Sequence, residues 1–370
     1  MKDRDILQND ERVIFGLREI YGRYGYSQYK MNKFEEYDLY VRNKDFLVSD
    51  NVITFTDTNG KLMALKPDVT LSIIKNADDE PTSLQKVFYN ENVYRVSGST
   101  RAFREIMQVG LECVGAVDTY AICEVLSLAA KSLSYISEDC LLDISDLDVV
   151  SQTIDSLGVT PSAKAELLKC VGEKNLHGIN AICESENADS TAADLLCTLV
   201  STYGPVSEVL PTLQKISAVY PKITALSEFI EICNTLDCFE IKDKMNVDFS
   251  VINDMNYYNG VVFKGFVKGI PSGILSGGQY GRLMKKLGKR SKAIGFAVYM
   301  DMLDELASDE SEFDVDTILL YGDKADARAV KKAVDELIKE GKSVSVQKCV
   351  PEKLRAREIL KLSDGEVIKI

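Results

Sequence analysis

The residues best suited to bind a small polar molecule lie along one predicted strand, residues 106–115. Gln108 and Glu112 flank Gly110 on one face of it, because side chains alternate in direction along a strand. The opposite face is apolar and consists of Met107, Val109, Leu111 and Cys113. A glutamine and a carboxylate beside a glycine are typical of the floor of a polar pocket. The same alternation occurs where one side of an antiparallel sheet faces solvent, so this strand alone leaves both interpretations open.

The single histidine of the chain, His177, excludes several mechanisms. A histidine-rich zinc site cannot be built within the chain, and a Ser-His-Asp triad or a Cys-His dyad would have to include this residue. His177 lies in Lys174-Asn175-Leu176-His177-Gly178, a segment typical of a turn between helices, with no nucleophile signature. The sequence also contains no P-loop motif and no strand-embedded Rossmann fingerprint. We therefore expect no metal site, no bound cofactor and no catalytic residue of these kinds.

The composition is that of an acidic globular protein. Its 370 residues are typical of two or three domains, and 44 Lys and Arg against 57 Asp and Glu give a net charge of −13. This charge disfavours a nucleic-acid binder, whose affinity depends on clustered Lys and Arg. The chain has no apolar signal core, no stretch of about 18 uncharged apolar residues and no Cys-x-x-Cys pair among its nine cysteines. We therefore expect a cytoplasmic protein with reduced thiols and no membrane segment.

The elements around the pocket strand have clear start and stop signals. Apolar residues at helical spacing predict a helix over residues 13–24, with Asp10 as its N-cap and Gly25 after its end. Asn59-Gly60 predicts a tight hairpin turn, because this pair tolerates positive φ angles. The other predicted elements of this part are strands over 52–55, 62–65 and 87–95 and a helix over 118–137.

Helical patterns dominate residues 144–240, where Thr160-Pro161 opens one helix that ends near Gly172. Strands return after them, and this order of elements indicates an antiparallel α+β domain split by a helical insertion. Residues 314–370 form a separate, nearly neutral α/β unit. The predicted elements after the insertion are strands over 247–251 and 261–267, Gly273–Ser276 leading into a helix over 280–287, a linker over 301–314, strands over 317–321, 343–347 and 367–370, and helices over 325–340 and 352–360.

Four motifs in sequence order give the chain a resemblance to a known family. They are Lys66-Pro67-Asp68-Val69-Thr70, Tyr94-Arg95 with residues 103–112, residues 255–263, and residues 276–280 with 295–297. Together they resemble the catalytic core of class II histidyl-tRNA synthetases and of their paralogue, the ATP phosphoribosyltransferase regulatory subunit. The resemblance implies a class II synthetase-like antiparallel sheet with flanking helices over residues 1–308, split by a helical insertion at about 144–240. It also implies that residues 314–370 resemble a truncated anticodon-binding domain.

The departures from the family motifs favour the regulatory subunit. Arginines that neutralise ATP phosphates in the family fall here on Asn253 and Met302, which carry no charge. Losing one such contact typically costs about 10²–10³ in rate. The Arg-x-Glu of motif 2 is also absent, because Val96-Ser97 follows Arg95. The resemblance therefore implies a chain without catalytic residues, and the short, neutral C-terminal unit disfavours tRNA recognition.

The positions that recognise histidine in the family are better retained in this sequence than the positions that bind ATP. Carboxylates suit an ammonium and an imidazolium, whereas hydroxyls and an amide orient neutral nitrogens. Asn256 stands where the family has an aspartate, which weakens the imidazole end. A degenerate pocket kept only for packing is the alternative. The resemblance implies that histidine binds among Asp68, Thr70, Gln108, Glu112, Tyr257 and Tyr258, with Arg95 near its carboxylate.

The function that the resemblance implies is a regulatory subunit of ATP phosphoribosyltransferase, needed for the first step of histidine biosynthesis. Such a subunit would form a synthetase-like dimer, bind short-form catalytic subunits and help histidine to inhibit them. Residues 174–179 are similar to a Lys-Asp-Leu-x-Gly-Leu turn of these subunits, although any helix–turn–helix with a glycine C-cap would match. Two alternatives stay open: a histidyl-tRNA synthetase, and a synthetase paralogue that acts as an amino-acid sensor or adaptor.

Overall fold

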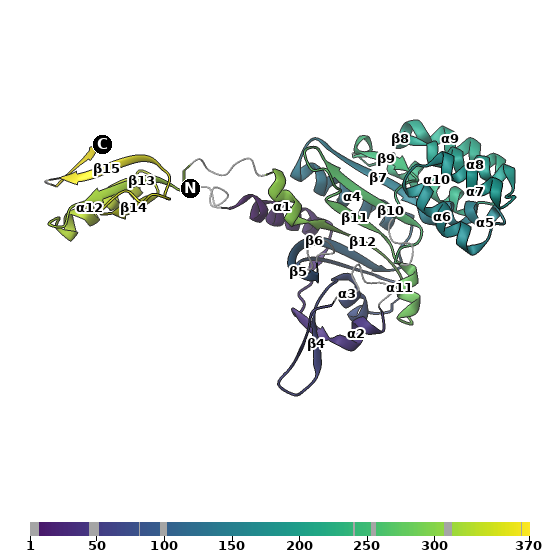
Figure 1. Ribbon diagram of the computed structural model, residues 1–370, viewed down its shortest axis with the longest axis horizontal. Helices are drawn as coiled ribbons and strands as arrows, with labels where there is room; N and C mark the ends of the chain where they lie inside the picture. Colours follow the sequence, from purple (N-terminus) through teal and green to yellow (C-terminus); the bar gives the residue numbers. More distant parts are fainter. Residues whose placement is uncertain are drawn as a thin grey trace. The chain divides into compact units, whose positions relative to one another are not determined.

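The computed structural model describes residues 7–43, 52–80, 82–96, 102–239, 241–252, 257–306, 313–363 and 365–370. The chain divides into two units, Met1–Leu306 and Ala307–Ile370, each with its own hydrophobic core. The larger unit contains a nine-stranded sheet and its helices, and the smaller unit contains a four-stranded sheet (Figure 1).

The nine-stranded sheet is the framework of the larger unit. Its strand order is β1-β5-β6-β12-β11-β10-β7-β9-β8, and of these strands β1 pairs with β5 and β7 with β9 in parallel, while the others pair antiparallel. The predicted antiparallel α+β architecture is therefore confirmed. The strands are β1 (Ser27–Gln28), β5 (Leu84–Val96), β6 (Phe103–Gly115), β7 (Cys140–Asp146), β8 (Tyr203–Pro205), β9 (Met245–Asp248), β10 (Val261–Val267), β11 (Leu275–Gln279) and β12 (Lys292–Tyr299).

One face of this sheet is covered by helix α4 (Thr119–Ile136). The Asp118 side chain caps the helix by accepting a 2.9 Å hydrogen bond from the backbone N–H of Ala121. Leu126 and Leu133 are fully buried against the sheet, and burying side chains of this size stabilises the fold by about 1.5–3 kcal/mol each. Helix α1 (Asn9–Arg23) packs on α4. The opposite face of the sheet is therefore the one available to a ligand.

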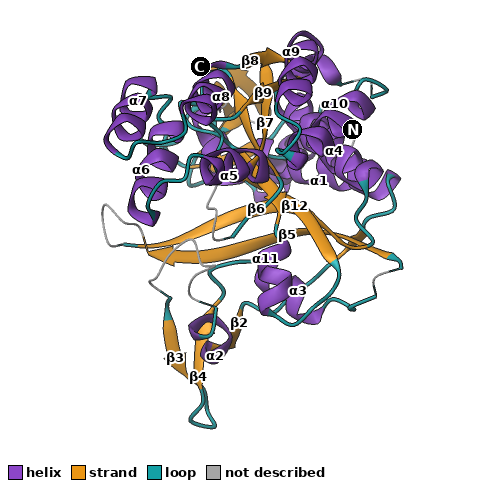
Figure 2. Ribbon diagram, turned by 90° about the vertical axis from the view of Figure 1, so that its right-hand side faces the viewer, coloured by secondary structure: helices purple, strands orange, loops and turns teal. Residues whose placement is uncertain are grey.

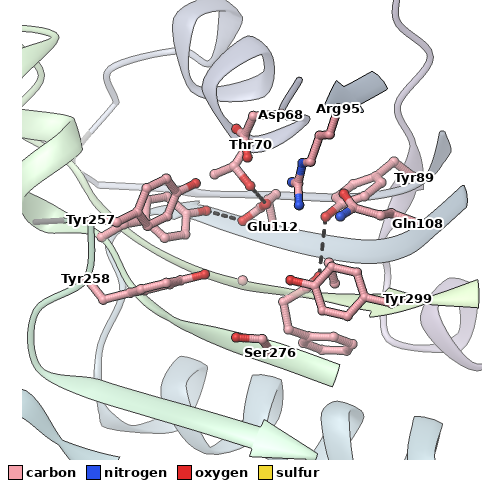
Figure 3. Close-up of a pocket in the computed structure, with 14 residues that line it drawn as sticks. Asp68, Thr70, Tyr89, Arg95, Gln108, Glu112, Tyr257, Tyr258, Ser276 and Tyr299 are labelled. Carbon is pink, nitrogen blue, oxygen red and sulfur yellow. Dashed lines mark hydrogen bonds between the residues drawn. The ribbon is translucent and has the colours of Figure 1, made fainter. Parts of the chain in front are cut away.

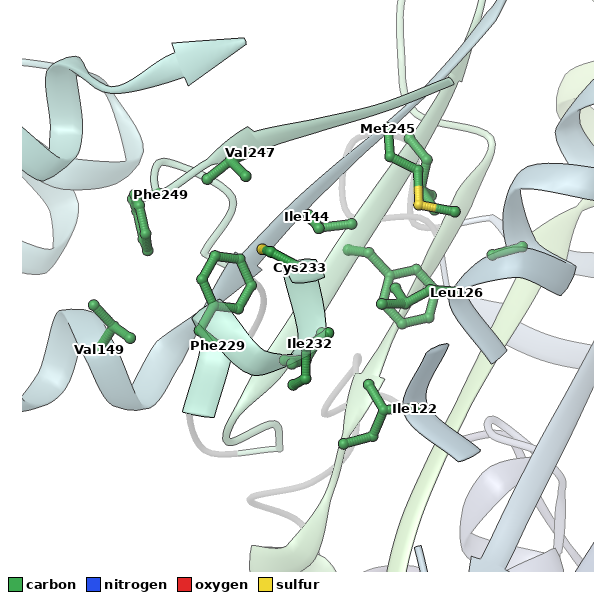
Figure 4. Packing of buried hydrophobic residues seen from close by; sticks show 14 of the residues in the cluster. Ile122, Leu126, Ile144, Val149, Phe229, Ile232, Cys233, Met245, Val247 and Phe249 are labelled. Atoms are coloured by element: carbon green, nitrogen blue, oxygen red, sulfur yellow. The ribbon is translucent and has the colours of Figure 1, made fainter. Parts of the chain in front are cut away.

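A helical insertion separates β7 from β9 in the sequence. Its last helix, α10, packs on α4 and β7, where Phe229, Ile232 and Cys233 fill the space beside Ile144 and Val247 (Figure 4). The insertion thus shares one continuous core with the sheet. Its helices are α5 (Leu147–Ser156), α6 (Pro161–Gly172), α7 (Leu176–Ser185), α8 (Ser190–Ser201), α9 (Val206–Val219) and α10 (Thr224–Leu236).

The turn between α6 and α7 ties the insertion to the edge of the sheet. Lys174 has a φ of 53°, and its Nζ donates a 2.8 Å hydrogen bond to Asp248 Oδ2 and lies 4.6 Å from the centre of the Tyr203 ring. A lysine and not a glycine therefore holds the left-handed position that ends α6. Asn175 is the N-cap of α7, so His177 lies exposed in the first turn of this helix and not in the interhelical turn that the sequence predicts.

A second, three-stranded sheet of order β2-β4-β3 extends away from β5 and β6 (Figure 2). Gly60 has a φ of +80° in the turn between β3 and β4, as the Asn59-Gly60 pair predicts. The chain then leads into α3, which brings the Asp68–Thr70 segment towards β6. The elements of this part are β2 (Phe34–Glu36), α2 (Tyr37–Val41), β3 (Thr54–Thr56), β4 (Leu62–Leu65) and α3 (Thr70–Asn76).

The smaller unit is a sheet of order β14-β13-β15-β16 with helix α12 packed on it. The helix predicted over residues 352–360 is wrong, because residues 356–363 form β15, which pairs with β13 on one side and β16 on the other. Leu360 and Leu362 are buried and Lys361 is exposed, which is the alternation of a strand. The elements are β13 (Val315–Tyr321), α12 (Ala327–Lys339), β14 (Val344–Gln347), β15 (Ala356–Ser363) and β16 (Glu366–Lys369).

Several predicted boundaries shift. Helix α1 begins at Asn9 and not after Asp10, because Gln8 is its N-cap and forms a capping box with Glu11. Residues 277–278 lie inside β11, and α11 (Gly281–Lys286) follows it. The 3₁₀ helix over residues 300–306 leads towards a linker that lies partly outside the described residues.

Three findings concern the predicted absences. The nine cysteines are free thiols, of which Cys238 and Cys349 are exposed. Within the described ranges, no helix combines the length and the apolar character needed to span a bilayer. Nor do the described side chains contain a group of three or more His, Cys, Asp or Glu placed to hold a metal ion.

Candidate functional site

A polar cavity lies on the face of the sheet that α4 leaves uncovered. Leu111 and Cys113 point into the core with α4, so Gln108 and Glu112, at alternate positions of β6, point into the cavity. The free space inside the cavity is about 60 Å³, which is room for a few water molecules, and the cavity opens to solvent on one side. Its lining residues are Asp68, Thr70, Tyr89, Arg95, Gln108, Glu112, Tyr257, Tyr258, Ser276, Tyr280, Gly295, Phe296, Ala297 and Tyr299.

The seven side chains that the family resemblance assigns to histidine recognition all line this one cavity, although they come from segments as far apart as residues 68 and 258. Figure 3 shows Asp68, Thr70 and Arg95 on one side of Glu112, and Ser276 and Tyr258 on the other. Gln108 and Glu112 are 3% and 1% exposed, which excludes the solvent-facing interpretation of their strand.

Glycines keep the floor of the cavity flat. Gly295 of β12 pairs with Glu112 of β6, and a β-carbon at position 295 would lie 1.8 Å from Glu112 Oε2. A β-carbon at Gly278 of β11 would lie 2.8 Å from the Tyr258 ring. Any side chain at these two positions would therefore displace a group that lines the cavity.

The wall opposite the floor is the segment before α3. The Asp68 carboxylate accepts a 2.8 Å hydrogen bond from the backbone N–H of Leu71, which fixes the carboxylate at the first turn of the helix. Arg95 Nε donates a 3.0 Å hydrogen bond to the carbonyl oxygen of Pro67. The segment and the end of β5 therefore hold each other in place at the mouth of the cavity.

A buried ion pair supports this wall from behind. The side chain of Lys66 is 1% exposed, and its Nζ pairs with the Glu91 carboxylate of β5, which is 16% exposed. Such a pair contributes little net stability, but removing one partner leaves an uncompensated buried charge. The Lys66–Thr70 segment is thus held in a single position against β5.

Glu112 is the most buried acidic side chain of the cavity, at 1% exposed against 8% for Asp68. Thr70 Oγ1 donates a 2.6 Å hydrogen bond to Glu112 Oε1, and the Tyr280 hydroxyl donates a hydrogen bond to Oε2. The pKa of Glu112 is raised from 4.5 to about 8, mainly by burial and also by the neighbouring Asp68, while these two hydrogen bonds act to lower it. At neutral pH the empty cavity therefore presents a protonated carboxyl group.

The other charged side chains of the cavity are Asp68 and Arg95, which lie on the same side of Glu112 (Figure 3). Burial raises the pKa of Asp68, whereas the hydrogen bond from Leu71 and the nearby Arg95 lower it. Arg95 is the single cationic side chain among the described lining residues. The site therefore combines an anionic or neutral acidic end with one guanidinium.

Tyrosines form the remaining walls. The rings of Tyr257 and Tyr258 lie 4.6 Å apart between centroids, and Tyr257 lies 6.1 Å from Tyr280. Burial raises the pKa of Tyr89, Tyr257, Tyr258 and Tyr280 well above 10, so their hydroxyls stay neutral and act as hydrogen-bond donors and acceptors.

Several lining residues are absent from the set that the sequence assigns to histidine. Tyr280 belongs to the motif of residues 276–280 and follows the two glycines of β11. Its place in that motif was the signal that could have identified it as a lining residue. Ser276 and residues 295–297 belong to the same motif. Tyr89 and Tyr299 gave no such signal, because only the strand pairing shows that Tyr89 lies opposite Gly110 and Tyr299 opposite Gln108 on the floor.

The two positions where the family's arginines are replaced differ in what the structure shows. Met302 lies half-buried against the hydrophobic core, with its sulfur 3.6 Å from the Ser272 hydroxyl. Asn253 lies outside the described residues, as does Asn256.

These groups suit a ligand of one chemical type. Asp68 and Thr70 can bind an ammonium, Arg95 can bind a carboxylate, and Glu112 and the tyrosines can bind a polar side chain through hydrogen bonds. An α-amino acid with a hydrogen-bonding ring presents these three features at once.

A family model described as histidyl-tRNA synthetase matches residues 6–303. The ATP phosphoribosyltransferase regulatory subunit of Acetivibrio thermocellus is 26% identical over 362 residues, covering 93% of this chain and 85% of the relative. A histidine–tRNA ligase of Methanocaldococcus jannaschii is 27% identical over 359 residues, covering 94% and 82%. The resemblance that the motifs predict is therefore confirmed over most of the chain.

Solved structures share the fold. An ATP phosphoribosyltransferase regulatory subunit/histidyl-tRNA synthetase from Bacillus halodurans matches with a TM-score of 0.72 at 23% identity, covering 92% of this chain and 88% of that chain. A chain of the ATP phosphoribosyl transferase (HisG:HisZ) complex from Thermotoga maritima matches with a TM-score of 0.60 at 19% identity, covering 80% and 98%. The predicted class II synthetase-like fold is confirmed.

Proposed function

This chain belongs to the histidyl-tRNA synthetase family, and from that premise we propose that it is a non-catalytic regulatory subunit of ATP phosphoribosyltransferase. The transferase joins ATP to phosphoribosyl pyrophosphate in the first step of histidine biosynthesis. The observation that carries the proposal is the content of the cavity, which keeps groups for an amino acid but has one cationic side chain, Arg95, among its described lining. The curated relatives named as regulatory subunits agree with it.

The charge of the cavity argues against adenylate formation. Activating an amino acid with ATP requires positioned cations for the phosphates and for the charge that develops in the transition state. Met302 packs against the core where the family has an arginine, and Tyr299 occupies the end of β12 beside Arg95. A chain with these replacements can keep an amino-acid pocket while losing the means to activate its occupant.

Histidine is the amino acid that we assign to the cavity. Asp68 and Thr70 would hold its ammonium, and Arg95 its carboxylate. Glu112, Gln108 and the two tyrosines 257 and 258 would surround its imidazole. Each end of the ligand would thus replace its water contacts with charge-assisted or buried hydrogen bonds.

In this proposal the chain binds short-form catalytic subunits, activates them and transmits inhibition by histidine. Such feedback is a coupling free energy of about 1–3 kcal/mol between the histidine site and the substrate sites of the partner. A synthetase-like dimer of this chain would be the platform for assembly. The HisG:HisZ complex from Thermotoga maritima, one chain of which shares this fold, is a precedent for such an assembly.

Reconstitution tests the proposal. Mixing this chain with a short-form transferase from the same genome should raise phosphoribosyl-ATP formation well above the rate of the transferase alone. Light scattering should show a complex, and histidine should lower the stimulated rate. A mixture that shows neither stimulation nor a complex would contradict the regulatory function.

A further inference from the structure

Glu112 is held at both oxygens and yet has no positive partner. The side chain is 1% exposed, Thr70 Oγ1 donates to Oε1 at 2.6 Å, and Tyr280 donates to Oε2. None of the ion pairs between described side chains involves Glu112. A buried carboxylate without a cation is costly, so an empty cavity favours the form in which Glu112 carries a proton.

The charged and titratable groups around Glu112 reinforce this preference. Asp68, which precedes α3, is the acidic side chain whose charge raises the pKa of Glu112, so it disfavours a second negative charge in the cavity. Arg95, at the end of β5, is engaged by the Pro67 carbonyl and by Tyr299. The other titratable groups that face the same space are the neutral hydroxyls of Tyr89, Tyr257, Tyr258 and Tyr280.

We propose that Glu112 enters the complex with a proton and shares that proton with the imidazole of the bound ligand, so that the cavity selects a side chain that is a neutral proton acceptor. This inference rests on the proposed histidine pocket and deepens it, because it specifies in which protonation state the ligand is taken up. The proton passes from a Glu112 carboxyl oxygen to a ring nitrogen and leaves a carboxylate beside an imidazolium. No other reactant is involved.

The hydrogen bonds already present fit this exchange. After the transfer, Thr70 and Tyr280 donate to a charged carboxylate, and hydrogen bonds to a charged group are stronger than those to a neutral one. The imidazolium then supplies the positive partner that Glu112 lacks in the empty cavity. In the complex, the imidazole ring and the Glu112 carboxyl group therefore hold one proton in total.

This requirement predicts a particular pH dependence. The pKa of Glu112 in the empty cavity is about 8, and the pKa of a free imidazole is about 6.5. Between these two values the free partners hold one proton in total, as the complex does, so binding exchanges no protons with solvent. Below about 6.5 they hold two and binding releases one, whereas above about 8 they hold none and binding takes one up. The dissociation constant is therefore flat in between and rises about tenfold per pH unit outside.

Calorimetric titration of the full chain with L-histidine, from pH 5.5 to 9 in buffers of different ionisation enthalpy, tests the proposal. We expect no net proton exchange by Glu112 and the ring near pH 7.2, and at pH 9 an uptake by Glu112 approaching one proton, in addition to the uptake by the ligand's own amino group. Glu112→Gln keeps the shape of the group but cannot titrate, so it should show only the part of the alkaline rise that comes from the ligand's amino group. Asp68→Asn is the matched control, which should lower the affinity and keep the Glu112 part of that rise, moved to lower pH because the Asp68 charge helps to raise the pKa of Glu112.

Two further measurements keep the test decisive. Tyr280→Phe removes a hydrogen bond that lowers the pKa of Glu112, so it should move the alkaline rise to higher pH even if the Glu112 variant does not fold. β-(Pyrazol-1-yl)alanine has nearly the shape of histidine but is a far weaker base, and it should bind at least tenfold more weakly at pH 7.2.

The outcomes separate this inference from the function on which it rests. Histidine that binds with uptake of a full proton at pH 7.2, or with an alkaline rise that Glu112→Gln leaves intact, would overturn the shared proton and leave the pocket standing. Histidine that does not bind at any pH would overturn the pocket and the inference together. Activation of the transferase, measured separately, bears on the regulatory function alone.

Discussion

Thr70 Oγ1 donates a 2.6 Å hydrogen bond to Glu112 Oε1, and this contact joins the first turn of α3 to β6 across 42 residues of sequence. Because Tyr280 binds the other carboxyl oxygen, the Glu112 side chain is oriented before any ligand arrives. A group oriented in this way loses little side-chain entropy on binding, so its contact with a ligand contributes more fully to affinity.

Removing the Glu112 carboxyl group should weaken histidine binding without preventing activation. A charge-assisted hydrogen bond is worth about 1.5–3 kcal/mol, so Glu112→Ala or Glu112→Gln should raise the dissociation constant roughly ten- to a hundredfold. Stimulation of the transferase should survive, because it depends on a docking surface and not on the pocket. Calorimetry and inhibition curves on the reconstituted complex measure both effects. Unchanged histidine sensitivity in Glu112→Ala and in a Tyr257/Tyr258 double substitution would show that feedback is located elsewhere.

The stability of the empty chain should depend on Glu112 and on pH. The pKa of this group is about 8 in the folded chain and 4.5 in the reference state, so the folded chain holds the proton more tightly. The free energy of unfolding therefore falls as pH rises from about 4.5 to about 8. Glu112→Gln should not show this part of the loss, which is on the order of 4 kcal/mol. Urea unfolding of both proteins at pH 5 and pH 8.5 measures it, and parallel pH profiles would contradict the raised pKa.

The chain should not form histidyl-adenylate, even at saturating ATP and histidine. Asn253 and Met302 replace charges that the reaction needs. Restoring arginine at both positions should favour ATP binding without restoring turnover, because Val96-Ser97 also alters motif 2. Met302→Arg should in addition cost stability, since position 302 is half-buried against the core. An ATP–pyrophosphate exchange assay measures the activity. Robust exchange by the unmodified chain would instead favour the synthetase, in line with the relative named histidine–tRNA ligase.

Breaking the buried pair behind the cavity wall should be more damaging than replacing it. Lys66→Met leaves the Glu91 carboxylate without a cation and should lower the free energy of unfolding by about 3–5 kcal/mol. Lys66→Met combined with Glu91→Leu removes both charges and should cost less than the single change. Urea unfolding of the two single variants and the double variant gives the coupling. Additive losses would show that the two side chains do not interact in solution.

Most of the larger unit follows from local signals in the sequence. The Asn59-Gly60 pair, the Thr160-Pro161 cap and Gly25 after α1 each dictate a backbone geometry that few other residues tolerate. The alternation along residues 106–115 places Gln108 and Glu112 on one face correctly, because a strand leaves no other choice.

The features that could not be predicted from the sequence depend on the pairing of strands that are far apart in the chain. Residues 352–358 contain helix-favouring Glu, Lys, Leu and Arg, and only the position of β15 between two partners makes the following segment a strand. The inclusion of Tyr89 and Tyr299 in the cavity likewise depends on strand register, which no single segment encodes. Whether the assigned residues bind histidine remains a prediction.

The cavity draws its walls from residues 68–112 and residues 257–299, the two stretches that flank the helical insertion in the sequence. A molecule bound there therefore links the two halves of the chain non-covalently. At a ligand concentration a hundred times the dissociation constant, binding adds about 2.7 kcal/mol to the free energy of unfolding. A chain cut at the exposed turn around Asn187 should consequently stay assembled at temperatures where, without ligand, its two fragments part.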